Sequence, residues 1–197
     1  MSENEQFQRK VNAGEILKQW LQLGPFYEDL SEEVEGLTLF EREDATVGRT
    51  AMQEIAVQAR SILAGEPREG EVASFRGMDA RWTLVRLPER YLSWGRYNIS
   101  NHLGAMFLAT IVVPDEPGVH EWQLSTMIST RAVVAVNGEI VYDNRDHPTE
   151  RTDRFYEYRF EAALKDGDNR VTVALFRLAR MAQVGCRLEI LDRPVEA

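Results

Sequence analysis

The chain has 197 residues, 44% of them hydrophobic and 28% charged, a composition typical of globular proteins that excludes the disordered and fibrous classes. A single all-β domain can have this length. The formal net charge of -9 argues against nucleic acid and anionic membranes as partners, because binding to either begins with a basic surface. The sequence has no apolar run of about 18 residues, so no membrane span is expected.

The cysteine content and the first residues bear on the cellular compartment. Cys186 is the only cysteine, so no internal disulfide can form. Residues 1–10 are polar and charged and lack the apolar core of a signal peptide. We therefore expect a cytoplasmic protein.

The N-terminal part of the chain combines a polar segment with one short strand. Residues 1–17 are predicted to be a polar arm, which up to about Gly14 is either loose or a short surface helix. Residues 18–23 alternate as a strand, and Gly24-Pro25 is expected to end it because proline has no N–H for the ladder. We interpret the acidic residues 27–43 as a mixed loop and short strand.

One segment has the period of an amphipathic helix, which we predict over about residues 51–64. Thr50 is in position to cap this helix, and Gly65 and Pro67 are expected to end it. Its apolar face would consist of Met52, Ile55, Ala56, Ala59, Ile62 and Leu63.

After the helix the apolar period changes to two, which predicts strands. The first of them cover residues 72–75, 81–87, 105–113 and 119–127. Residues 131–136 and 139–142 then flank Asn137-Gly138, the dipeptide that best tolerates the positive φ angles of a two-residue hairpin turn. Further strands are expected around residues 155–160, 171–178 and 186–191.

These elements predict an all-β fold, an antiparallel jelly-roll β-sandwich of about eight or nine strands with one inserted amphipathic helix. We assign residues 18–192 to a single sandwich domain, with the helical insertion at residues 50–65 and a C-terminal tail at residues 193–197. One core is expected. Its inward-facing residues would include Leu84, Phe107, Ala109, Ile111, Trp122, Leu124, Val134, Val136, Val171, Val173 and Leu188.

Three segments together resemble a known family. Residues 20–26 (WLQLGPF) are similar to the opening strand of galactose-binding-like jelly-roll domains attached to bacterial glycan-processing enzymes. Residues 131–142 (RAVVAVNGEIVY) look like the family's hairpin, and residues 163–173 (ALKDGDNRVTV) are similar to its Leu-x-x-Gly-x-Asn-x-Val-x-Val segment. The resemblance implies a non-catalytic accessory module that binds carbohydrate or packs against a catalytic domain of a larger glycan-processing protein.

The stretch from residue 91 to residue 102 is the candidate carbohydrate-binding site, because it is dense in aromatic, amide and imidazole groups. An aromatic ring can stack on the apolar face of a sugar while nearby donors and acceptors bind hydroxyl groups. A second interpretation is a crossing loop whose Trp94 and Tyr97 close one end of the sandwich. The candidate residues are Tyr91, Trp94, Arg96, Tyr97, Asn98, Asn101 and His102.

Metal and catalytic signatures are weaker. Jelly rolls of this type can hold structural calcium through loop carboxylates and carbonyls, so Asp166 and Asp168 are candidate calcium ligands, and no other cofactor is expected. His147 and its acidic neighbours are interpreted as a solvated loop. The sequence has no Gly-x-Ser-x-Gly motif and no phosphate-binding glycine loop, and Cys186 is interpreted as a packed thiol.

Three functions stay open on the sequence. The first is the accessory module, with an oligosaccharide or a catalytic domain as partner. The second is a self-contained or homo-oligomeric structural subunit that works through protein contacts, with the acidic segment or the helix as its interface. The third, a glycan-active enzyme, would need a cluster of catalytic or ligating residues that the sequence does not reveal.

Overall fold

The structure is a computed structural model, which describes residues 8–11, 14, 16–32, 35–36, 57–86, 92–94, 102–126, 130–144, 156–179 and 184–191. Within these ranges the chain forms thirteen strands and one helix, at residues 57–64. The strands are β1 (Gln8–Val11), β2 (Gln19–Asp29), β3 (Val72–Phe75), β4 (Met78–Arg81), β5 (Thr83–Arg86), β6 (Leu92–Trp94), β7 (His102–Pro114), β8 (Gly118–Thr126), β9 (Arg131–Val136), β10 (Glu139–Asp143), β11 (Tyr156–Leu164), β12 (Asn169–Ala179) and β13 (Val184–Ile190).

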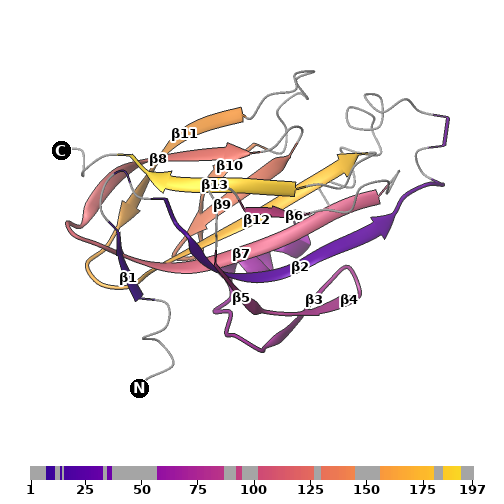
Figure 1. The fold of residues 1–197 in the computed structure, drawn as a ribbon, viewed down its shortest axis with the longest axis horizontal. Coiled ribbons are helices and arrows are strands. Elements are labelled where there is room, and N and C mark those ends of the chain that lie inside the picture. The colour runs from indigo at the N-terminus through magenta and orange to yellow at the C-terminus, as the bar shows by residue number, and fades with distance from the viewer. Residues whose placement is uncertain are drawn as a thin grey trace.

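Two sheets form the sandwich (Figure 1). The larger has the order β10-β9-β12-β7-β2-β5, with β1 added beside β7, and the smaller has the order β11-β8-β13-β6. The chain crosses between the sheets from β7 to β8, from β8 to β9, and at each step from β10 to β13, as in a jelly roll. The predicted all-β sandwich with one helix is therefore confirmed.

The hairpin at Asn137-Gly138 has the turn that the sequence predicts. Asn137 has φ of 53° and Gly138 has φ of 86°, so both central residues are in the left-handed region that a type I′ turn requires. The turn joins β9 to β10, and a β-bulge between Ile140 and Tyr142 follows it in β10.

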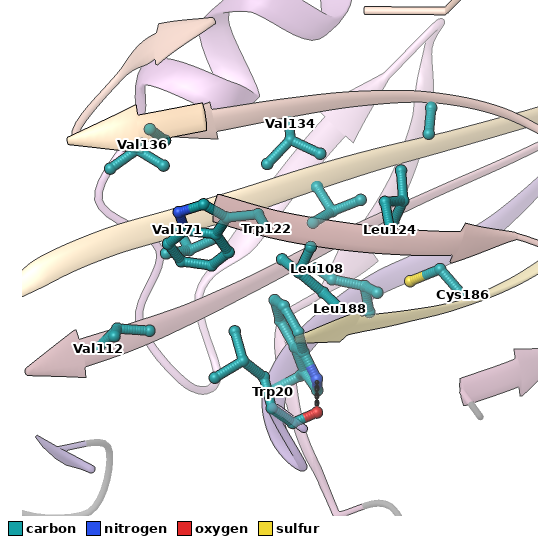
Figure 2. Packing of buried hydrophobic residues seen from close by; sticks show 14 of the residues in the cluster. Trp20, Leu108, Val112, Trp122, Leu124, Val134, Val136, Val171, Cys186 and Leu188 are labelled. Atoms are coloured by element: carbon teal, nitrogen blue, oxygen red, sulfur yellow. Dashed lines mark hydrogen bonds between the residues drawn. The ribbon is translucent and has the colours of Figure 1, made fainter. Parts of the chain in front are cut away.

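The first core lies between the two sheets (Figure 2). Trp122 and Leu124 of β8 face it from the small sheet, and Trp20 of β2 faces it from the large sheet. The indole Nε1 of Trp20 donates a hydrogen bond of 3.0 Å to the backbone oxygen of Leu17, which satisfies its one polar atom inside the core.

A second core lies on the opposite face of the large sheet, beneath the helix and the β3–β4 hairpin. Phe26, Phe75, Phe107 and Phe176 pack there with ring centroids 5.0 to 6.5 Å apart. The helix contributes Ala59, Ile62 and Leu63. Residues 51–56 of the predicted helix lie outside the described residues.

The expectation of a single core is therefore wrong. Phe107 and Ala109 lie in the second core, and Leu84 packs against that core, although all three were expected between the sheets. The reason is that β7 is buried on both faces, with every residue from 103 to 110 buried. A strand buried on both faces has an apolar run without alternation, so its sequence does not reveal which side belongs to which core.

Two local predictions also fail. Gly24-Pro25 does not end the strand, because β2 continues to Asp29 through a bulge between Leu23 and Phe26 where a proline needs no ladder N–H. In the predicted arm, residues 8–11 form β1, which pairs with β7 in parallel. No helix in the described part of the chain is long and apolar enough to cross a membrane.

Candidate functional site

The predicted carbohydrate-binding stretch connects the two sheets. Trp94 ends β6, the edge strand of the small sheet, where it pairs with Val184 of β13. His102 begins β7 of the large sheet. The other predicted residues, Tyr91, Arg96, Tyr97, Asn98 and Asn101, lie outside the described residues, so the site as a whole stays a prediction.

The calcium candidates Asp166 and Asp168 are both exposed, in the turn between β11 and β12. Asn169 organises this turn from inside. Its Nδ2 donates to the backbone oxygens of Lys165 at 2.8 Å and of Gly167 at 3.0 Å, so two carbonyls that could face a cation face the amide instead. Calcium binding here stays a prediction, which a calcium-dependent rise in melting temperature would support.

In the part of the chain that is described, no three His, Cys, Asp or Glu side chains lie close enough together to hold one metal ion. The ring Nε2 of His120 lies 3.0 Å from the backbone oxygen of Glu116, in the turn between β7 and β8. His147, Asp146 and Glu150 lie outside the described residues.

Cys186 is confirmed as a packed thiol. It lies in the core between the sheets and is buried. Burial raises the pKa of this thiol to about 12, because the thiolate would lose its hydration. The thiol therefore stays protonated and unreactive at neutral pH.

Aromatic residues close the open side of the sandwich between the edge strands β10 and β11. Phe160 stacks on Trp122 with centroids 6.2 Å apart and on Tyr142 with centroids 5.1 Å apart. Tyr142 also contacts Tyr158. Burial raises the pKa of the Tyr142 hydroxyl above its ordinary value, and the neighbouring Tyr158 hydroxyl raises it further, by a smaller amount. Phe160 thus packs within the protein between two rings, which makes it a poor sugar platform.

The outer face of the small sheet has a different chemistry, which we call the polar face. Alternate residues of its strands face the core, so the residues between them face outward. Register places Arg159 of β11, Gln123 of β8 and Glu189 of β13 in one row across the sheet. The polar face consists of Glu121, Gln123, Ser125, Glu157, Arg159, Glu161, Arg187 and Glu189.

Two ion pairs order this face. Arg187 donates from Nη2 to Glu189 two residues further along β13, and Arg159 Nη1 lies 3.4 Å from Glu121 Oε1 on the neighbouring strand. Gln123 and Glu189 are each only 8% exposed although they face outward. The polar face therefore holds its central side chains in a sheltered position, with more exposed charges on β11.

Sequence reasoning did not identify the polar face as a candidate site. The alternation of Glu121, Gln123 and Ser125 with apolar neighbours was visible, and so was that of Arg187 and Glu189. What the sequence lacked was the pairing of β8 with β13, whose residues are about sixty positions apart in the chain. Only that pairing brings the two polar sets together.

The chain matches no family model, and no curated protein matches its sequence. Solved structures with partial similarity include a β-glucosidase from Kluyveromyces marxianus in complex with glucose, at 17% identity and a TM-score of 0.43. That match covers 56% of this chain and 14% of the β-glucosidase, so this chain spans a small part of that enzyme.

Two other similar structures come from different organisms. The Arthrobacter globiformis T6 isomalto-dextranase complexed with panose is 14% identical, with a TM-score of 0.32 and coverage of 61% of this chain and 26% of the enzyme. The epithelial adhesin 9 A domain of Candida glabrata, in complex with Galβ1-4GlcNAc, is 10% identical with a TM-score of 0.40. That match covers 97% of this chain and 91% of the adhesin domain. The sugars bound in these three structures are ligands of those proteins, and TM-scores below 0.5 do not extend them to this chain.

Proposed function

We propose that this chain is a non-catalytic carbohydrate-binding module whose ligand lies on the polar face of the small sheet. The observation that carries the proposal is the row of Arg159, Gln123 and Glu189 across three neighbouring strands. The resemblance of three sequence segments to accessory domains of glycan-processing enzymes supports the same function.

The layering of the molecule favours the small sheet over the large one. The outer face of the large sheet packs against the helix and the β3–β4 hairpin, through residues such as Leu63 and Phe75. The inner faces of both sheets are occupied by the core between them. The polar face is therefore the broad sheet surface, among the described elements, whose side chains are suited to a hydrophilic ligand.

The chemistry of the polar face fits sugar hydroxyl groups. A carboxylate accepts hydrogen bonds from hydroxyl groups, a guanidinium group donates them, and the amide of Gln123 does both. The ion pair between Arg187 and Glu189 restrains both side chains, which lowers the entropy lost on binding. The predicted stacking residue Trp94 ends β6, which lies beside β13 in the same sheet.

Titration calorimetry against a panel of oligosaccharides tests the proposal. We expect Gln123→Ala to weaken binding about tenfold, because it removes the hydrogen bonds of one buried amide. Trp94→Ala should weaken binding as well if the predicted ring stacks on the sugar. Glu139→Ala, at an exposed position in the β9–β10 hairpin of the other sheet, is the matched control and should bind as the wild type does.

Melting temperatures of the variants separate a loss of binding from a loss of folding. The proposal is wrong if no oligosaccharide on the panel binds the folded wild-type protein. A sugar that binds equally well to wild type and to folded Gln123→Ala would place the site away from the polar face.

A further inference from the structure

We infer that the polar face selects uncharged glycans and takes them in a segment at least two sugar rings long, laid across the strands. This inference rests on the proposed function and specifies its ligand class. Two features of the polar face carry it, the balance of its charges and the length of its central row.

The charges of the polar face favour a neutral ligand. Its outward positions hold four carboxylates, on Glu121, Glu157, Glu161 and Glu189, and two guanidinium groups, a net charge of -2. Both guanidinium groups are engaged by carboxylates of the same face.

Glu157 and Glu161 are exposed on β11 and form no ion pair with another described residue. A carboxylated or sulfated glycan would therefore approach two carboxylates that form no ion pair, and both guanidinium groups of this face would already be paired. Like charges across an interface act against binding, and here they would discriminate between glycans that differ in little else. The net charge of -9 on the whole chain adds to this repulsion.

The length of the central row sets the size of the ligand. Arg159, Gln123 and Glu189 lie on three adjacent strands, so the row extends across roughly 10 Å, about twice the strand spacing. This length corresponds to a disaccharide unit. One sugar ring could reach only two of the three side chains, so a monosaccharide should bind more weakly than a longer chain.

A matched pair of glycans tests the charge selection. An α-1,4-linked galactose tetrasaccharide and tetragalacturonate differ only in the oxidation of C6. Calorimetry on the full chain compares the two, alongside neutral tetrasaccharides of glucose, mannose and xylose. We expect at least one neutral tetrasaccharide to bind about tenfold more tightly than tetragalacturonate. The reason is that the carboxylates of Glu157 and Glu161 repel the carboxylates of tetragalacturonate at short range in water. The corresponding monosaccharide should bind more weakly than its tetrasaccharide.

The double variant Glu157→Gln/Glu161→Gln supplies the control. Both positions are exposed, so folding should be unaffected, and the affinity for tetragalacturonate should rise relative to the affinity for the neutral glycan. Tetragalacturonate binding as tightly as the neutral chains would overturn the inference and leave the proposed function standing. If no glycan binds, the proposed function fails, and the inference fails with it.

Discussion

At the scale of single residues, two asparagines recognised in the sequence hold two turns together. The side-chain Nδ2 of Asn137, in the β9–β10 turn, donates to Oδ1 of Asn169 at 2.9 Å. The same Oδ1 accepts from the backbone N–H of Lys165 at 2.9 Å, and Asn137 Oδ1 accepts from the backbone N–H of Arg170. Two of the three segments that resemble the family therefore have a structural role at one end of the large sheet.

Replacement of Asn169 by aspartate tests this role. Asn169 is fully buried, and Asn169→Asp would place a carboxylate oxygen against the carbonyls of Lys165 and Gly167 in place of a donor. We expect the free energy of unfolding to fall by roughly 2–4 kcal/mol, measured by urea titration. The reverse exchange Asp166→Asn, exposed in the same turn, is the control and should change it by less than about 0.5 kcal/mol. Equal effects of the two exchanges would contradict the role of Asn169.

At the scale of elements, the helix is a structural cover for the large sheet. Ala59, Ile62 and Leu63 face the second core. Arg170 of β12 ties the end of the helix to the sheet, since its Nη2 donates to the backbone oxygen of Ala64 at 3.2 Å. A cation beside the last carbonyls of a helix is a favourable arrangement. The helix therefore depends on the sheet for its position.

Two substitutions on this helix separate packing from propensity. Leu63 is 2% exposed and Val57 is 69% exposed. Leu63→Ala should lower the free energy of unfolding by about 2–5 kcal/mol, because it removes buried methyl groups and leaves a cavity. Val57→Ala, the control, should change it by no more than about 0.5 kcal/mol. Chemical denaturation measures both, and a small effect of Leu63→Ala would show that the helix is not docked.

At the scale of the whole molecule, the two cores share the strands of the large sheet. In β12, Val173 and Leu175 face the core between the sheets, whereas Ala174 and Phe176 face the second core. In β9, Val134 and Ala135 are divided in the same way. Neither core can be dismantled without distorting strands that the other core needs.

We therefore expect both cores to unfold in one cooperative transition. Trp82 reports on the second core, whereas Trp20 and Trp122 report on the core between the sheets. For wild type, and separately for Trp82→Phe, the unfolding midpoint from tryptophan fluorescence should equal the midpoint from far-ultraviolet circular dichroism, as two-state unfolding requires. A separate early transition lost in Trp82→Phe would mean that the outer layer unfolds independently.

The sequence by itself determined the strands from β7 to β13, the Asn137-Gly138 turn and the all-β class, because these depend on local alternation and on residues that tolerate positive φ. It also determined that Trp20 faces the opposite side from Leu21 and Leu23, since neighbouring residues in a strand point to opposite faces. The predicted burial of Trp122 is confirmed as well.

Only the tertiary structure decided what each face of the sheets meets. The helix and the β3–β4 hairpin turn the outer face of the large sheet into a second core, which no local pattern in β7 could reveal. The pairing of β8 with both β11 and β13 assembles the polar face from residues far apart in the chain. Alternation along a strand shows which of its residues share a face. Which other strands and layers that face meets depends on long-range pairing, and the proposed ligand site depends on that pairing.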